Sequence, residues 1–379
     1  MEHADEQMAE RAARWTGTMR GHGADGIALA HADSWGSPGS TCTLDRRARE
    51  DAEHAGLAPL ATKSSGAGDR EADEAPDPFR TCFERDRDRI LHANAFRRLA
   101  GKTQVFVFPD DHQRTRLTHA LEVAQIARSV SQAIGLNVAL TEAIALGHDC
   151  GHGPGGHASE DALTPFVAEG YDHAVWGADV VLVPLNLCAE TLDGIRNHSW
   201  SRPAPATPEG EVVSWADRIA YVCHDFEDAV AAGIVTEDML PPLVADRVGR
   251  DRSRQLGTFV RAMIEATATT GRIGMVDPIA EALAEFRRFD YEHIYMRPAS
   301  RAQGDAVITL LQALVEHFAD RPNLLPAAHY VPGGVEAGSP AALRAAVTYV
   351  GGMTDRFACR QALALLDWPH HRLPQGIDV

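Results

Sequence analysis

The chain lacks features that membrane-spanning, secreted and duplex-DNA-binding proteins need. Its 379 residues contain no apolar run of about 18 residues, so no membrane span is expected. Six scattered cysteines without a CxxC pair, and an acidic start without a signal-peptide core, favour reduced thiols in a cytoplasmic protein. A net charge of −17 argues against nonspecific binding of duplex DNA, but it allows a small anionic ligand held by a local basic cluster.

Convincing sets of alternating strands are also missing, whereas helical periodicity recurs from Pro78 onwards. The sequence therefore predicts an all-α fold. Residues 1–75 are rich in Gly, Ser, Ala and Asp, which predicts loop or disorder with short helices near 4–14 and 43–55. A short β-prone run is expected over Gln104–Phe108.

A basic interval interrupts the acidic chain between Arg80 and Arg116, where nine Lys or Arg residues stand against five acids. The motif ERDRDR at 84–89 favours ion pairs on the surface of a helix. Four cations are harder to pair locally and are better candidates for binding phosphate: Arg97, Arg98, Lys102 and Arg116.

The most unusual stretch is GHDCGHGPGGHASE at 147–160, which carries three histidines and two acids among five glycines and one proline. The glycines disfavour regular helix. Burying so many imidazole and carboxylate groups is costly unless they bind something. The stretch therefore predicts a metal site with acid–base groups beside it.

Three predicted amphipathic helices bring further ligands to this stretch. His119 lies on the apolar face of a helix expected from Thr118 to Gly135, although an inward histidine is more often a core residue. His148 and Asp149 end a helix expected over 137–149. A long helix expected over 211–233 carries a stripe of polar residues, namely Asp217, Tyr221, Asp225 and Asp228. The alternative interpretation is that this stripe simply faces solvent.

Two imidazoles and two carboxylates are thereby expected at one place, from His119, His148, Asp149 and Asp217. Such a mixed set suits an octahedral divalent ion such as Mn, Mg, Co, Fe or Ni. It is a poor structural zinc site, which would favour cysteines. An adjacent His-Asp pair is common by itself, but the order H…HD…D on three successive helices is a strong signal.

This order resembles the HD-domain superfamily of metal-dependent phosphohydrolases. Longer segments resemble the deoxyguanosine triphosphate triphosphohydrolase (dNTPase) family over roughly residues 55–379, namely FRTCFERDRDRILHANAFRRLAGKTQVFVF, RTRLTHALEVAQIARSV, LTEAIALGHDCGHGPGGHASE, ADRIAYVCHD and GMTDRFA. The resemblance implies an HD-domain helical bundle with additional C-terminal helices. It divides the chain into a poorly ordered extension over 1–55, a core over 56–300 and a C-terminal helical region over 301–379.

The resemblance also implies roles for individual residues. His119, His148, Asp149 and Asp217 match metal ligands; His157 and Glu160 match the catalytic histidine and the acid that orients it, and His152 lines the phosphate site. Six further positions match substrate-binding residues: Gln104, Arg116, His173, Arg218, Tyr221 and Asp225. Among these, Arg116 and Arg218 would hold phosphate, and Tyr221 would sit where a ribose 2′-hydroxyl would clash.

The implied reaction is metal-dependent hydrolysis of a deoxynucleoside triphosphate to deoxynucleoside and tripolyphosphate. Breaking the bond at the α-phosphorus needs charge neutralisation, a positioned water and a proton for the leaving oxygen, and the metal, the arginines and His157 would provide them. Two alternatives remain open: hydrolysis of another nucleotide or phosphoester, and a non-catalytic nucleotide-sensing or nucleic-acid-binding role. Further expected partners are an activating dNTP, single-stranded nucleic acid and other copies of the chain, as in a hexamer.

Two positions depart from the family pattern. The family usually has an aromatic residue where this chain has Gly155, and Asn or Glu where it has Ala174. We expect a glycine at position 155 to loosen the loop that positions His157.

Overall fold

The computed structural model describes residues 2–24, 26–37, 39, 43–106, 113–329 and 334–374. Most of these residues are helical. The strands among the described residues form one short antiparallel pair, β1 (His22–Ala24) and β2 (Ile27–Leu29). The all-α prediction is therefore confirmed. Within the described ranges, no helix has the length and apolar character needed to cross a membrane.

The chain forms two compact units, Met1–Leu44 and Asp45–Val379. The first contains α1 (Glu2–Gly17), and the second begins with α2 (Arg46–Gly56), so both helices predicted near the N-terminus are present. Asp45 caps α2, because its carboxylate accepts a hydrogen bond from the backbone N–H of Ala48 at 2.9 Å. The domain boundaries proposed after residues 55 and 300 stay predictions.

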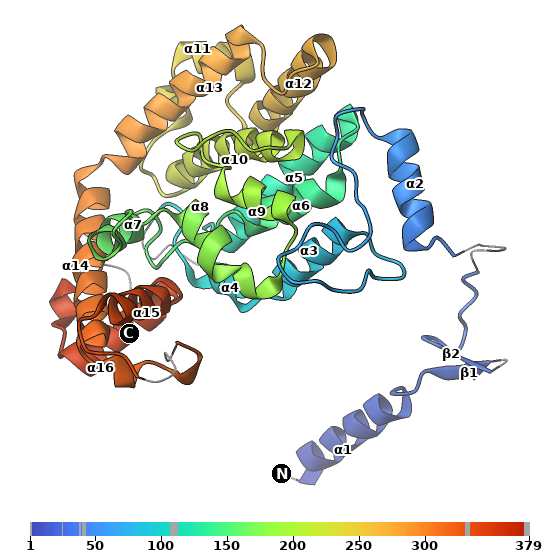
Figure 1. The fold of residues 1–379 in the computed structure, drawn as a ribbon, viewed down its shortest axis with the longest axis horizontal. Helices are drawn as coiled ribbons and strands as arrows, with labels where there is room; N and C mark the ends of the chain where they lie inside the picture. The colour runs from blue at the N-terminus through green and yellow to red at the C-terminus, as the bar shows by residue number, and fades with distance from the viewer. Residues whose placement is uncertain are drawn as a thin grey trace. The chain divides into compact units, whose positions relative to one another are not determined.

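Three helices form the centre of the second unit: α5 (Arg116–Ile134), α6 (Val138–Gly147) and α10 (Pro208–Ala231), as Figure 1 shows. The sequence of α6 is apolar on nearly every side, which explains why it is surrounded by α5, α10, α3 (Cys82–His92) and α9 (Ala189–Arg196). Its end therefore lies in the protein interior, where a polar group needs a specific partner.

Helix α5 begins earlier than predicted. Thr118 is not the N-cap; Thr115 occupies that position, and Thr118 Oγ1 accepts a hydrogen bond from the Thr115 N–H at 3.0 Å. The helix ends as expected at Gly135, whose φ of 74° is a left-handed conformation that glycine adopts without strain. The earlier start places Arg116 on the first helical turn, below His119.

The remaining helices surround this centre. On one side α12 (Arg252–Thr270) packs on α5 and α10, while α13 (Asp277–Asp290) packs on α10 and α11 (Pro242–Val248). The part of the predicted β-prone run that the structure describes, Gln104–Phe106, forms bends and no strand; Val107 and Phe108 lie outside the described residues.

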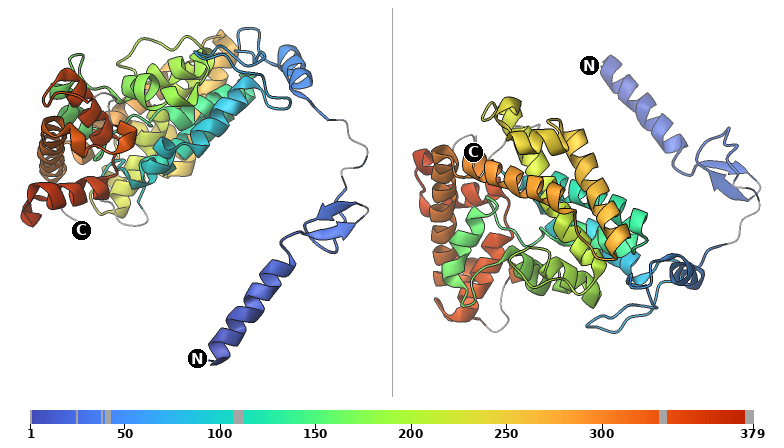
Figure 2. Two further views of the ribbon diagram at one scale, coloured as in Figure 1. Left: turned by 60° about the horizontal axis from the view of Figure 1, so that its bottom comes forward. Right: turned by 90° about the horizontal axis from the view of Figure 1, so that it is seen from above.

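The C-terminal helices build a second apolar cluster, seen at one side of the ribbon in Figure 2. It joins α14 (Pro298–Asp320), α15 (Pro340–Gly351) and α16 (Asp355–Leu366). The short helix α7 (Ala158–Leu163) also enters this cluster through Leu163, which is fully buried. The stretch 147–160 therefore runs from the central helices at its start to the C-terminal cluster at its end.

Candidate active site

The predicted metal ligands converge where α5, α6 and α10 meet. His119 Nε2 on α5 lies 3.0 Å from Asp217 Oδ1 on α10. Just beyond α6, His148 Nε2 lies 3.4 Å from Asp149 Oδ1 and 3.7 Å from Asp217 Oδ1. His119, His148 and Asp149 are buried, and Asp217 is partly buried. Ligand atoms of His119, His148 and Asp217 all lie within 4.8 Å of one another.

The surroundings of His148 show that this donor set fits a cation. His148 Nδ1 donates a hydrogen bond to the carbonyl oxygen of Ala145 at 2.6 Å, and its Nε2 faces Asp149 and Asp217. This Nε2 is buried and has no hydrogen-bond partner. A buried ring nitrogen without a partner beside two carboxylates is a place where a metal ion can bind all three groups.

Both carboxylates of this set favour the ionised form. Burial alone would raise the pKa of Asp149, but the charges of Arg116 and His148 outweigh it and hold that pKa well below its usual range. Burial also opposes ionisation of Asp217, yet the hydrogen bond from His119 and the charge of His148 lower its pKa. The site therefore offers two ionised carboxylates beside two imidazole rings, which is a divalent-cation donor set once the ring nitrogens that face the carboxylates lose their protons to the metal.

A second histidine cluster lies next to the first. The rings of His152 and His173 stack with centroids 3.7 Å apart, and His152 Nε2 lies 3.3 Å from Asp149 Oδ1. His173 Nδ1 lies 2.6 Å from Glu160 Oε1, and its Nε2 lies 3.3 Å from His198 Nε2. The two clusters share Asp149 and form one continuous polar centre.

The His173 ring has a hydrogen-bond partner at each of its two nitrogens. His198 Nδ1 donates to the carbonyl oxygen of Ile195 at 2.8 Å, so His198 Nε2 accepts from His173. The other nitrogen of His173 donates to the Glu160 carboxylate. Burial would lower the pKa of His173, but the hydrogen bond and charge of Glu160 raise it. Both nitrogens of His173 are therefore engaged, one with Glu160 and one with His198.

His198 was not among the residues predicted for the site. It is buried, and its Nε2 contacts the second nitrogen of His173. The sequence did contain a pattern that could have identified His198. It lies just beyond the end of the amphipathic helix α9, as His148 lies just beyond the end of α6. A histidine just beyond a buried helix end can donate to one of the unpaired carbonyl oxygens there.

Arg116 is a buried cation with unused hydrogen-bonding capacity. Only 1% of the residue is exposed, and its Nη1 donates to Asp149 Oδ2 at 2.8 Å. Its Nε and Nη2 are buried without partners. Gly156 lies against this guanidinium; a Cβ at Gly156, whose φ is +65°, would stand 2.9 Å from Nη2. Unpaired guanidinium donors in the interior fit an anion such as phosphate.

His157 lies at the exposed side of this centre, with its ring centroid 5.1 Å from that of His152. Loss of water around the ring, followed by the charge of Arg116, lowers the pKa of His157. Glu160 was expected to orient His157, but its Oε1 accepts a hydrogen bond from His173 Nδ1 at 2.6 Å instead. Both His157 and Glu160 nevertheless offer atoms within 4.8 Å of His152.

Three predicted substrate residues follow Asp217 along α10. The Arg218 guanidinium lies 3.4 Å from the centroid of the Trp200 ring, and Tyr221 OH accepts a hydrogen bond from Arg287 Nε at 2.8 Å. Asp225 Oδ2 accepts from Tyr295 OH at 2.5 Å. The polar stripe of α10 is partly or fully buried at all four positions, Asp217, Tyr221, Asp225 and Asp228. The alternative that this stripe faces solvent is therefore wrong.

The other predicted phosphate candidates have different partners. Lys102 is buried and donates to the carbonyl oxygens of His152 and Gly351, so it is not a free cation. Arg97 donates to Asn94 Oδ1. Gln104 Oε1 is buried without a partner, and the described contacts do not join it to the histidines. The ion pairs predicted for ERDRDR are present, such as Arg87 with Glu142 at 3.0 Å.

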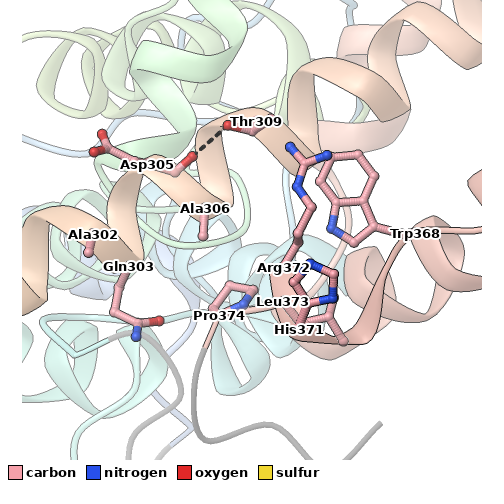
Figure 3. Close-up of a pocket in the computed structure, with 10 residues that line it drawn as sticks. All are labelled: Ala302, Gln303, Asp305, Ala306, Thr309, Trp368, His371, Arg372, Leu373 and Pro374. Carbon is pink, nitrogen blue, oxygen red and sulfur yellow. Dashed lines mark hydrogen bonds between the residues drawn. The ribbon is translucent and has the colours of Figure 1, made fainter.

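A cavity of about 370 Å³ lies elsewhere, between α14 and the segment after α16 (Figure 3). Its lining includes Asp305, Trp368 and Arg372, and the Arg372 guanidinium lies 4.6 Å from the centroid of the Trp368 ring. None of its lining residues belongs to either histidine cluster. The chemistry of the polar centre therefore does not extend to this cavity.

Comparison with known proteins agrees with this geometry. Residues 116–222 match the family described as HD domain, and residues 273–363 match the Phosphohydrolase-associated domain. The chain is similar to a Deoxyguanosinetriphosphate triphosphohydrolase-like protein of Caldanaerobacter subterraneus, with 39% identity over 320 residues that cover 83% of this chain and 93% of that one. A protein of the same description from Clostridium perfringens is 38% identical over 331 residues, covering 82% of this chain and 94% of its own. A crystal structure of a hypothetical protein from Aquifex aeolicus aligns with a TM-score of 0.46 and 18% identity, over 73% of this chain and 67% of that one.

Proposed function

Because the chain belongs to the HD-domain family of deoxyguanosinetriphosphate triphosphohydrolase-like proteins, we propose that it hydrolyses deoxynucleoside triphosphates to deoxynucleosides and tripolyphosphate. One observation carries the choice of a phosphate-bearing substrate. Arg116 is buried beside Asp149 with two donors unpaired, and it faces the glycine turn that leads to His157. A phosphate oxygen would satisfy those donors.

A divalent ion held by His119, His148, Asp149 and Asp217 would supply charge neutralisation at the reacting phosphate. Arg116 then binds phosphate oxygens on that side of the site. Its Nε and Nη2 are buried without partners, whereas both nitrogens of His173 are already engaged with Glu160 and His198, so His173 supports the neighbouring His152 ring without binding phosphate. These fixed charges stabilise the negative charge that develops as the bond at the α-phosphorus breaks.

His157 transfers the proton that the leaving deoxynucleoside oxygen needs. Its pKa is lowered in the protein, but a bound triphosphate places several negative charges near the ring and raises the pKa again. His157 is exposed, so it can reach a substrate that enters from solvent. Its proton then moves to the leaving oxygen within hydrogen-bond distance.

The sugar is bound by residues of α10 together with Gln104. Tyr221, whose hydroxyl accepts a hydrogen bond from Arg287, would exclude a ribose 2′-hydroxyl, as the family resemblance implies. Asp225 and Gln104 each keep a buried oxygen without a partner, and one of these oxygens would accept the single hydrogen bond that the sugar 3′-hydroxyl donates.

The purified protein should be incubated with Mn²⁺ or Mg²⁺ and each dNTP separately, and the products should be separated by ion-exchange chromatography. We expect tripolyphosphate and deoxynucleoside in equal amounts. Release of pyrophosphate or monophosphate would overturn the proposal in favour of another phosphohydrolase reaction. The absence of turnover, with or without a second dNTP as activator, would support a nucleotide-sensing or nucleic-acid-binding role.

A further inference from the structure

The loop 151–156 connects the metal ligands to His157 and has few internal hydrogen bonds. Inside the loop region, Gly153 N donates to Ser159 Oγ at 3.0 Å, and Ser159 Oγ donates to Gly156 O at 2.6 Å. Tyr171 OH donates to Gly151 O at 2.7 Å. A segment rich in glycine has much conformational freedom to lose. Its geometry therefore depends on residues outside it.

The first such residue is Asp355, the first residue of α16. Asp355 Oδ1 accepts a hydrogen bond from the Gly155 N–H at 2.8 Å. Its Oδ2 accepts from the Thr103 N–H at 2.8 Å and from Thr103 Oγ1 at 2.7 Å. Only 6% of Asp355 is exposed. One buried carboxylate thus joins the loop, the segment before α5 and a C-terminal helix.

The second residue is Lys102, which is 3% exposed. Lys102 Nζ donates to the carbonyl oxygen of His152 and, at 3.1 Å, to the carbonyl oxygen of Gly351 at the end of α15. The positive charge of Lys102 also lies close enough to Asp355 to influence it. Lys102 and Asp355, which we call the clamp, together hold both ends of the turn 152–155.

Val307 on α14 is a third residue from outside the loop that lies against it. Gly155 has a φ of +74°, and a Cβ added there would meet Val307 Cγ1 at 2.5 Å. The glycine that departs from the family pattern is therefore restrained by the Asp355 hydrogen bond and by contact with Val307. These contacts oppose the expected loosening of the loop by Gly155, which stays a prediction.

We infer that Asp355 and Lys102 are positioning residues, through which the C-terminal helices hold the loop 151–156 in the geometry that His152 and His157 need. Neither belongs to the histidine clusters, and the contacts of Lys102 replace the phosphate-binding role expected for it from the sequence. A displacement of about 1 Å at a reacting group can cost about a hundredfold in rate. The kinetic consequence rests on the proposed function, whereas the loop geometry does not.

The test compares wild type with Asp355→Asn, in which the side chain keeps its size. Its single carbonyl oxygen can accept from the two Thr103 donors, which leaves an NH2 group facing the Gly155 N–H in place of an acceptor. We expect kcat to fall at least about tenfold, with KM and bound metal nearly unchanged. Hydrogen–deuterium exchange of peptides covering 150–157 should become faster. Lys102→Met, which keeps the buried stem and removes the ammonium, should give the same pattern.

Ser339→Ala is the matched control. Ser339 Oγ accepts from the Ala342 N–H at 3.2 Å and caps α15, and none of its described hydrogen bonds reaches the loop. This variant should leave kcat and exchange over 150–157 as in wild type. The inference is overturned if Asp355→Asn leaves both quantities unchanged, or if exchange rises equally throughout α14–α16. If wild type does not hydrolyse dNTPs, the proposed function fails, but exchange and metal content still test the clamp.

Discussion

Backbone carbonyl groups at two helix ends control the chemistry of single histidines in the site. His148 and His198 each donate Nδ1–H to the carbonyl oxygen of the residue three positions earlier, Ala145 and Ile195 respectively. Helix C-termini leave such oxygens unpaired. In both cases Nε2 faces the site, so local backbone structure determines how the ring is oriented.

Substitution of Asp149 and of His157 should separate metal binding from proton transfer. Asp149→Ala should abolish metal binding, because it removes an ionised oxygen next to His148 and leaves Arg116 without its partner. His157→Ala should retain the metal and lose roughly a hundredfold or more in kcat. Metal content by elemental analysis and initial rates check both. Full activity of His157→Ala would show that another group transfers the proton.

Asp225 should make stability depend on pH. Burial raises the pKa of Asp225 to about 7, although the hydrogen bond from Tyr295 acts in the opposite direction. Between the unfolded value near 4 and this folded value near 7, the native state binds more protons than the unfolded state. Stability from this group is therefore lost as the pH rises through that window.

We expect the Tm of wild type to fall relative to that of Asp225→Asn as the pH is raised from about 5 to about 8. The amide keeps the shape of the side chain but cannot ionise. Thermal unfolding of both proteins in the same series of buffers gives the difference curve. A difference that is constant with pH would show that Asp225 does not titrate in this range.

At the scale of elements, the contact between the loop 151–156 and α14 should contribute to the free energy of unfolding. Gly155→Ala places a Cβ against Val307 at a positive φ, which should cost about 1–3 kcal/mol in addition to the backbone strain. Gly271→Ala is the matched control, since Gly271 has a φ of +69° with no atom within 4 Å of the added Cβ.

Denaturant unfolding should show a larger loss for Gly155→Ala than for Gly271→Ala. The double variant Gly155→Ala with Val307→Ala should be more stable than expected from the sum of the two single changes, because the smaller residue at position 307 makes room for the new methyl group. Strict additivity of the two changes would argue that the clash with Val307 is relieved elsewhere.

At the scale of the whole molecule, the site belongs entirely to the second compact unit. Every residue of the two histidine clusters, and both residues of the clamp, lie within Asp45–Val379. Removal of residues 1–44 should therefore leave bound metal, Tm and kcat as in the full chain. Parallel purification and assay of the two proteins tests this, and loss of metal from the shorter one would assign the N-terminal unit a part in the site.

The convergence of the candidate metal ligands could be predicted from the sequence because it depends on local periodicity. His119, His148 and Asp217 each follow the apolar face of an amphipathic helix, so their inward direction is a property of a few neighbouring residues. The glycine-rich stretch identified the turn to His157 for the same reason, since only the backbone freedom of glycine permits it.

Only the tertiary structure decided which groups restrain that turn. Asp355 and Val307 are far from Gly155 in the chain, and their contacts with the loop arise from the packing of α14 and α16 on it. The partner of Glu160 and the part played by His198 were likewise decided by which side chains meet across helices. Periodicity determines which face of a helix is buried, but the neighbour of that face is set by the packing of the whole chain.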